Sequence, residues 1–150
     1  TPYNLRNCAY MEDFYKQKIV YPNMTKYLPF VYDNNGFLTN QKCFIITGEN
    51  VEFLTAFFNS SIFKYCFRDN FPELQGGTRE LSKIFIDKIS VIEISEETNL
   101  QFKKIIDKIQ QMKKNNESTK ELELNIDNLL FNLYYLTEEE IREIGFIEIL

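Results

Sequence analysis

Two apolar stripes at helical spacing lie in the last third of the sequence, and they constrain the fold more than any other feature. The first stripe runs from Phe102 to Met112 and the second from Leu122 to Leu133. Their apolar residues recur every three or four positions, as on one face of an α-helix. Only a short polar break around Asn115-Asn116 separates them. Two such helices are expected to fold back on each other as an antiparallel hairpin.

Capping residues mark where the helices of this region should begin. Ser95 is followed by acidic residues, which favour a helix start. Ser118 and Thr137 are each followed, three residues later, by Glu121 and Glu140, which is the spacing of a capping box. The sequence therefore predicts a hairpin of two long helices and then a short third helix.

The first fifty residues instead alternate between short apolar runs and turn-forming residues. β-Branched and aromatic residues fill the runs, as expected for strands. Pro22, Asp33-Asn34-Asn35-Gly36 and Gly48 interrupt them. The runs are residues 18–21, 30–32, 37–38 and 43–47. This order predicts a β-meander, in which the Asp33–Gly36 turn either forms a simple hairpin or presents its two asparagines to a partner.

From Val51 the apolar period becomes that of a helix, predicted to span residues 51–67 with Asn50 as its N-cap. A loop containing Gly76-Gly77 follows it. Beyond the loop, the apolar runs 84–86 and 89–94 are interpreted as strands.

The predicted fold class is therefore α+β. Residues 1–94 are expected to form a β-rich domain with one packed helix. Residues 95–150 are expected to form a helical spacer or docking segment packed on that domain. Because the sequence begins at Thr1 within what reads as ordered chain, we expect a fragment of a longer protein.

The charge of the chain is unevenly distributed. The net charge is −5, which argues superficially against a nucleic-acid partner. However, residues 1–90 contain ten Lys and Arg against nine Asp and Glu, a net of +1, whereas residues 91–150 contain seven against thirteen, a net of −6. The acidity belongs to the helical segment, so a basic face in the first part is compatible with the composition.

Several kinds of catalytic chemistry lack their residues here. The sequence contains no histidine, which removes His-based triads and the commonest general base. No Gly-rich phosphate loop and no Asn-Pro-Pro-Tyr-like motif is present. Adjacent carboxylates do not face each other on a helix, so they are interpreted as solvated surface or helix-start residues. We expect no catalytic residues, no metal site and no bound cofactor.

The cysteines and the hydropathy point to an intracellular setting. Cys8, Cys43 and Cys66 are odd in number and widely spaced, which supports neither a disulfide framework nor a zinc ribbon. No apolar run approaches the roughly 18 residues that a membrane span needs. The expected location is the cytoplasm, without a membrane partner.

Taken in order, the segments resemble a known family. The segments are Lys18–Pro22, Phe30–Phe37, Phe44–Gly48, Leu54–Ser60, Gly76–Arg79 and a strand ending near Ile94. They resemble the TaqI-like C-terminal specificity domain of adenine-N6 DNA methyltransferases and fused restriction-modification enzymes. The tail, with Leu133-Tyr134-Tyr135-Leu136-Thr137, is similar to the helical segment that follows this domain, although Tyr135 stands where the family usually has Gly.

The resemblance implies a sequence-specific DNA-recognition module that is not catalytic alone. Its partners would be double-stranded DNA and a methyltransferase domain of the same polypeptide, which would bind S-adenosylmethionine and flip the adenine. The parent enzyme would methylate DNA, with or without an endonuclease activity. Two alternatives remain: a specificity subunit of a type I-like multi-subunit system, and a helical protein–protein docking module.

Recognition needs phosphate contacts that position the protein and base contacts that specify the sequence. The leading candidate is the loop Gln75-Gly76-Gly77-Thr78-Arg79, in which Gln75 can pair with adenine and Arg79 with guanine or a phosphate. It can equally be a plain turn with a solvated arginine. Asn34 and Asn35 are further candidates. The candidate phosphate contacts, each also readable as an ordinary surface charge, are Lys16, Lys18, Lys42, Lys64 and Arg68.

Overall fold

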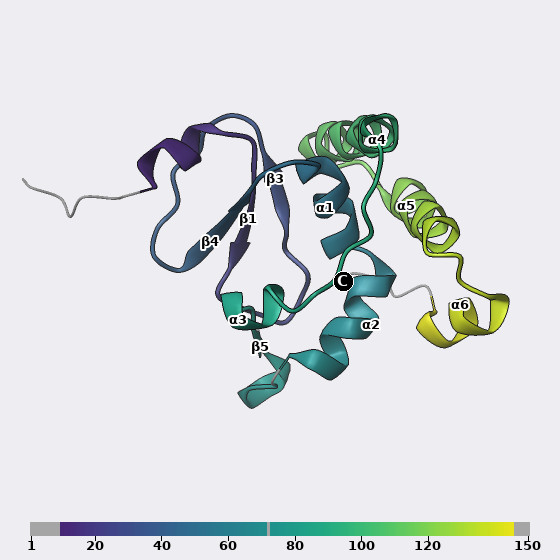
Figure 1. Ribbon diagram of the computed structural model, residues 1–150. Coiled ribbons are helices and arrows are strands. Elements are labelled where there is room, and N and C mark those ends of the chain that lie inside the picture. The colour runs from purple at the N-terminus through teal and green to yellow at the C-terminus, as the bar shows by residue number, and fades with distance from the viewer. Residues whose placement is uncertain (1–9, 72, 146–150) are drawn as a thin grey trace, which may run out of the picture.

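Helices and two small antiparallel sheets make up the chain, which confirms the α+β class (Figure 1). The computed structural model describes residues 10–71 and 73–145. The first part contains the 3₁₀ helices η1 (Met11–Tyr15) and η2 (Gln75–Gly77), the strands β1 (Lys18–Pro22), β2 (Met24–Thr25), β3 (Val31–Asp33), β4 (Cys43–Thr47) and β5 (Arg79–Glu80), and the helices α1 (Val51–Phe58), α2 (Ser61–Asn70) and α3 (Lys83–Ile86). The helices α4 (Glu96–Lys114), α5 (Lys120–Leu133) and α6 (Glu138–Ile144) follow.

The three-stranded sheet has the order β3-β1-β4, so the predicted meander is wrong. Strand β1 is central, and β3 and β4 both run antiparallel to it. The two outer strands are consequently parallel to each other, and no tight hairpin can join them. The segment from Asp33 to Gly36 therefore opens a long connection across the sheet, and residues 37–38 are not a strand.

One face of this sheet lies against the helices. The register places Ile19 beside Tyr32 and Ile46, and Tyr21 beside Phe44, on a common face. Helix α1 packs on this face, with α4 against α1 (Figure 1). Aromatic side chains fill the space between them: Phe30 stacks on Phe58 and meets Phe63 edge to face. These residues form one buried cluster.

The buried cluster continues into the C-terminal helices. Phe102 and Ile106 of α4 and Ile126 and Leu130 of α5 are buried in the same cluster as Ile19. The core thus runs across the predicted boundary at residue 94.

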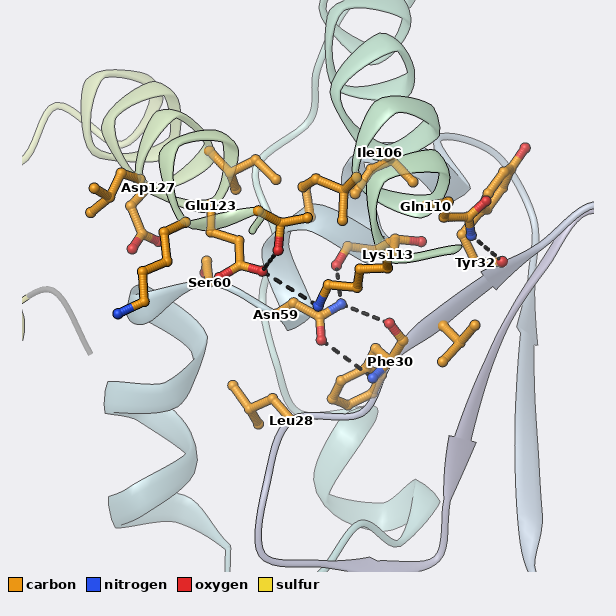
Figure 2. A pocket seen from close by; sticks show the side chains of 18 of the residues that line it. Leu28, Phe30, Tyr32, Asn59, Ser60, Ile106, Gln110, Lys113, Glu123 and Asp127 are labelled. Carbon is orange, nitrogen blue, oxygen red and sulfur yellow. Dashed lines mark hydrogen bonds and ion pairs between the residues drawn. The ribbon is translucent and has the colours of Figure 1, made fainter. Parts of the chain in front are cut away.

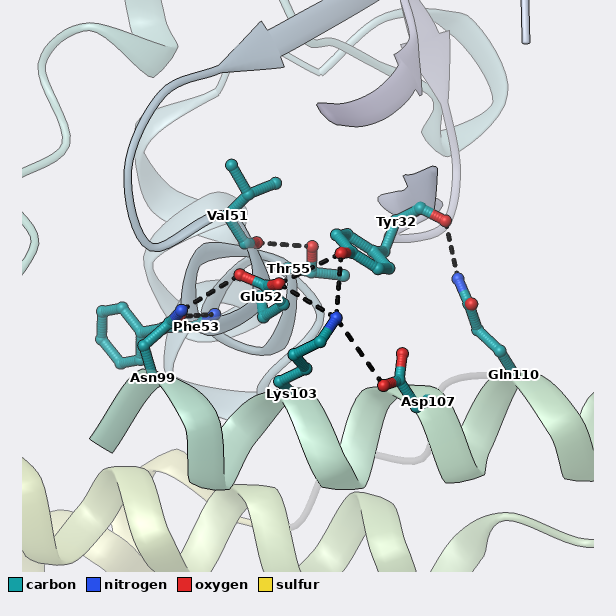
Figure 3. Close-up of polar contacts among 9 residues, drawn as sticks. All are labelled: Tyr32, Val51, Glu52, Phe53, Thr55, Asn99, Lys103, Asp107 and Gln110. Atoms are coloured by element: carbon teal, nitrogen blue, oxygen red, sulfur yellow. Dashed lines mark hydrogen bonds and ion pairs between the residues drawn. The ribbon is translucent and has the colours of Figure 1, made fainter. Parts of the chain in front are cut away.

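A buried polar network fixes α4 against α1 and β3 (Figure 3). The Tyr32 hydroxyl donates to Glu52 of α1 at 3.0 Å, and the Asn99 amide of α4 donates to the same carboxylate at 3.1 Å. Lys103 of α4 forms an ion pair with Glu52 at 3.3 Å. Burial raises the pKa of Glu52, but these hydrogen bonds outweigh it, and the pKa lies below its usual value. The charged carboxylate is thereby stabilised at the junction.

The helix predicted over residues 51–67 is two helices. Asn59 and Ser60 separate α1 from α2, and the Ser60 hydroxyl accepts a hydrogen bond from the Phe63 amide, as an N-cap does. The Asn59 side chain bonds to Phe30 and to the Thr55 carbonyl. These side-chain bonds replace the helical bonds that a continuous helix would make. Asn50 precedes α1 in the left-handed region, at φ 53°, without a side-chain cap.

The two strands expected at 84–86 and 89–94 are not strands. The first run lies in α3, and the second follows as an extended segment outside either sheet. Its half-buried apolar residues pack against the core, and the Ile92 amide donates to the Tyr134 hydroxyl at 3.2 Å. An apolar run packed on helices resembles a strand in sequence but has no neighbouring strand to pair with.

The C-terminal helices agree with the prediction. Ser95 caps α4, and Thr137 with Glu140 forms the predicted capping box of α6. The expected cap at Ser118 is wrong: α5 is preceded by Thr119, whose hydroxyl donates to Glu123 at 2.6 Å instead of accepting from the backbone. In the described part of the chain, no helix has the length and apolar character needed to cross a membrane.

Candidate nucleic-acid interface

Most of the predicted site residues lie at one of the two ends of the three-stranded sheet, and the other two, Lys64 and Arg68, lie on α2. We call residues 23–27, 40–42 and 73–81 the ribbon end, and residues 10–18 and 33–38 the ion-pair end. Strand β1 joins them, and its five residues separate the two ends by about 13 Å. In Figure 1, β5 lies at one end of β1 and the helical turn of η1 at the other.

The ribbon end is built on the two-stranded sheet of β2 and β5. Met24 pairs with Glu80, and Thr25 pairs with Arg79. Asn23, between β1 and β2, ties the neighbouring segments together: its amide donates to the Lys42 carbonyl at 2.9 Å, and its carbonyl accepts from the Leu81 amide at 2.8 Å. Lys42 and Leu81, far apart in sequence, are therefore both held against Asn23.

Arg79 closes the candidate recognition loop. Its guanidinium donates to the Phe71 carbonyl and lies 3.4 Å from the Glu73 carboxylate and 5.7 Å from the centre of the Phe67 ring. The side chain is only 16% exposed. In this conformation its donors are engaged within the protein, so Arg79 positions the loop and does not itself extend toward a base.

The tip of the loop consists of exposed glycine backbone. Gly76 and Gly77 have φ of +75° and +77°, which side chains rarely adopt. A Cβ added at either position would meet nothing within 4 Å. The fold therefore needs these glycines for their backbone angle and not for space. Thr78 is half-buried behind them, and the side chain of Gln75 lies outside the described part of the structure.

Two lysines at the ribbon end have charges available to a partner. Lys26 and Lys42 are exposed, and neither forms an ion pair with any described residue. Sequence reasoning identified Lys42 but missed Lys26, together with the exposed Met24 and Tyr27 beside it. The available signal was the unusual segment from Met24 to Tyr27, in which two large side chains flank a polar pair.

The ion-pair end uses its charges internally. Lys18 has no exposed surface, forms an ion pair with Asp33, and donates to the Phe14 carbonyl at 2.6 Å. The prediction that Lys18 contacts phosphate is wrong, because η1 covers this face of β1. Asp33 also accepts hydrogen bonds from the Asn35 and Phe37 amides, at 2.8 and 2.9 Å.

These contacts hold the Asp33 carboxylate in its charged form. Burial raises the pKa of Asp33, but the hydrogen bond and charge of Lys18, together with the two backbone amides, outweigh burial and lower the pKa below its usual value. Asn34 and Asn35 are exposed beside it. Lys16 is 61% exposed, but it forms an ion pair with Asp13 at 2.7 Å. These three residues lie far from the 75–79 loop.

Lys64 and Arg68 lie on α2, which leads into the ribbon end. The Arg68 guanidinium lies 4.9 Å from the centre of the Tyr65 ring, at the exposed surface. Lys64 is half-buried, and burial lowers the pKa of its ammonium group. Of the two, Arg68 is the better placed for a charged partner.

A cavity of about 700 Å³ lies between β3, the α1–α2 junction and the turn joining α4 to α5 (Figure 2). Its polar lining is engaged in the fold. The Asn59 amide bonds to both the amide and the carbonyl of Phe30, and Gln110 donates to the Tyr32 carbonyl at 2.6 Å. These side chains cover the outer edge of β3, so the edge is closed to an added strand.

Asp127, at the same cavity, caps α2. Its carboxylate accepts hydrogen bonds from the amide and the hydroxyl of Ser61, at 2.8 and 2.5 Å. Burial raises the pKa of Asp127. This carboxylate is a structural link between α5 and α2. Among the described residues, no group of three or more Cys, Asp or Glu side chains is placed to hold a metal ion.

Comparison with known protein families identifies a match for the first part of the chain. A family model described as the TaqI-like C-terminal specificity domain matches residues 2–91. The match includes the three-stranded sheet, the β2–β5 ribbon and the 75–79 loop, and it ends before α4. No curated protein matches the chain.

Proposed function

Because the chain belongs to the family of TaqI-like C-terminal specificity domains, we propose that it is a sequence-specific DNA-recognition module whose ribbon end lies against duplex DNA. Specificity domains of restriction-modification enzymes recognise the target and are not catalytic themselves. The function proposed for this chain is therefore the choice of DNA site for an enzyme whose chemistry takes place elsewhere.

The observation that carries the proposal is the closed loop of the ribbon end. The ribbon end exposes the backbone of its glycine tip, and the same end carries two lysines that have no acidic partner among the described residues. Lysines can neutralise phosphates of the DNA backbone. The glycine backbone, which has no side chains, can come close enough to the bases to contact their edges. Both kinds of contact that recognition needs are thus available at one end of the molecule.

The parent enzyme that we propose is a DNA adenine-N6 methyltransferase, with or without an endonuclease activity, acting in the cytoplasm. The support for this proposal is the resemblance to the specificity domains of such enzymes. S-adenosylmethionine would then be bound by a methyltransferase domain of the same polypeptide, which would also flip the adenine.

We further assign the C-terminal helices to contact with that domain and not with DNA. Residues 91–150 carry a net charge of −6, which repels phosphate. Leu100 of α4 and Leu124 of α5 are exposed apolar residues on these helices. The gene sequence upstream of this segment tests the assignment. A methyltransferase motif encoded there supports it, whereas a gene that encodes only specificity domains supports a separate specificity subunit.

The test of DNA recognition is selection from a random pool. Duplexes with a randomised segment are incubated with the 150-residue chain at low salt, and retained duplexes are amplified and sequenced over several rounds. The proposal predicts enrichment of one shared sequence. Retention without a shared sequence, or no retention, would contradict it. A variant with Lys26→Ala and Lys42→Ala is the control, and it should retain less DNA in every round.

A further inference from the structure

Two large exposed side chains lie at the ribbon end, one within β2 and one two residues after it. Met24 is 58% exposed and Tyr27 is 55% exposed. Because alternate residues of a strand point to opposite faces, Met24 and Glu80 share one face and Thr25 and Arg79 the other. Arg79 faces the protein interior, against the Phe67 ring. Met24 therefore lies on the outward face of the ribbon.

The backbone of Tyr27 is fixed by a single side chain. The Thr25 hydroxyl accepts a hydrogen bond from the Tyr27 amide at 3.0 Å and donates to the Tyr27 carbonyl at 2.8 Å. This local turn orders the backbone of Tyr27 before any partner binds, which reduces the entropic cost of a contact made there.

The charges around this pair indicate what the partner is. Lys26 lies between Met24 and Tyr27, and Lys42 lies across Asn23. Neither lysine has an acidic partner among the described residues. The ribbon end also carries two acidic residues: Glu80, which shares the face of Met24, is half-buried, and Glu73 is paired with Arg79. Exposed apolar groups with available cations at the same end fit an apolar feature framed by phosphates. The major groove of DNA offers that combination, because the C5 methyl of each thymine projects into it between two phosphate backbones.

We propose that Met24 and Tyr27 are specificity-determining residues that contact thymine methyl groups in the major groove. A two-stranded ribbon is narrow enough to enter that groove. Lys26 then meets a phosphate beside the contacted bases. This inference rests on the proposed function, and it adds a class of preferred target: duplex sites with A·T pairs under the ribbon.

The experiment removes only the methyl groups. A duplex selected from the random pool is compared with the same duplex in which deoxyuridine replaces every thymine, and binding is measured by fluorescence anisotropy at fixed salt. We expect the unsubstituted chain to bind the deoxyuridine duplex about fourfold more weakly for each contacted methyl, from the usual contribution of a buried CH₂ group. A variant with Met24→Ala and Tyr27→Ala should bind both duplexes equally.

The matched control is a variant with Phe37→Ala and Leu38→Ala. These residues are also exposed and apolar, but they lie at the ion-pair end. The control variant should show the same difference in affinity between the thymine and the deoxyuridine duplexes as the unsubstituted chain. If the unsubstituted chain binds DNA but does not distinguish the duplexes, the inference is wrong while the proposed function stands. If the chain binds no DNA, both are wrong.

Discussion

The two ends of the three-stranded sheet contain similar residues but use them in opposite ways. At the ion-pair end, Lys18 is buried against Asp33, and Lys16 is paired with Asp13. At the ribbon end, Lys26 and Lys42 are exposed and have no acidic partner among the residues described. A lysine therefore indicates a binding surface only when no acidic group within the fold already pairs with its charge.

The largest expected effect comes from breaking the ion-pair end. Lys18→Met leaves the Asp33 carboxylate buried without its counter-charge, which typically costs about 3–5 kcal/mol. Urea unfolding at pH 7 should show a loss of this size, whereas Lys42→Met should change the free energy of unfolding by less than about 0.5 kcal/mol. Equal losses for the two variants would contradict the contrast between the ends.

Acid should reduce the difference in the free energy of unfolding between the unsubstituted chain and the Lys18→Met variant. The pKa of Asp33 is lowered in the folded chain from its usual value of 3.8. A lowered pKa contributes stability above the unfolded pKa, and that contribution is lost as the pH falls through the folded pKa. Unfolding measured below pH 3.8 should therefore show a smaller penalty for the variant than at pH 7. A constant penalty would mean that the charge of Asp33 is not responsible.

Arg79 is expected to give the next largest effect. Arg79→Ala removes the bond to the Phe71 carbonyl, and a hydrogen bond to a charged group is worth about 1.5–3 kcal/mol. The free energy of unfolding should fall by about that amount. Preference for the selected duplex over random DNA should also fall, because the loop loses its closed shape. Arg79→Lys, which can still reach one acceptor, should recover part of both. If stability is unchanged and affinity falls equally for the selected duplex and for random DNA, Arg79 is a phosphate contact instead.

Substitutions at Gly76 should affect the stability of the fold and the binding of DNA to different extents. Gly76→Ala should cost about 1–2 kcal/mol of stability, because of its positive φ. Gly76→Asn should cost less, since asparagine tolerates this region. Both variants should bind the selected duplex more weakly, because each places a Cβ between the backbone and DNA. Full binding by a stable Gly76→Asn variant would exclude close approach of the tip.

The smallest expected effect is the change in DNA affinity when one exposed lysine is replaced. Lys42→Ala should weaken binding uniformly across duplex sequences and lower the slope of log affinity against log salt by about 1. Lys16→Ala should leave this slope unchanged, because its charge is paired with Asp13 at the opposite end. Titrations at several salt concentrations measure both. A larger effect for Lys16 would reverse the assignment of the two ends.

Features set by local sequence could be predicted, and those set by distant contacts could not. The helical period and the capping residues Ser95 and Thr137 act within one or two turns, and the structure confirms them. The burial of Lys18 depends on Asp33, fifteen residues away, and on η1 covering the strand. The β-branched run after α3 has strand-like composition, yet no neighbouring strand pairs with it.

The candidate site shows the same division. The 75–79 loop could be identified from its glycines, because their backbone freedom is a local property. The role of Arg79 could not, since the Phe71 carbonyl it meets is brought near by the end of α2. The ribbon of β2 and β5 pairs segments more than fifty residues apart, so the composition of the Met24–Tyr27 segment could not by itself place Met24 and Tyr27 at the same end as the 75–79 loop.

Hydrogen exchange measured with and without a selected duplex tests most directly that the ribbon end is the DNA interface. On binding, amides of residues 23–27 and 73–81 should exchange more slowly, while those of residues 10–18 and 33–38 should keep their rates. Protection confined to the ion-pair end or to α4 and α5, with the ribbon end unchanged, would contradict the account.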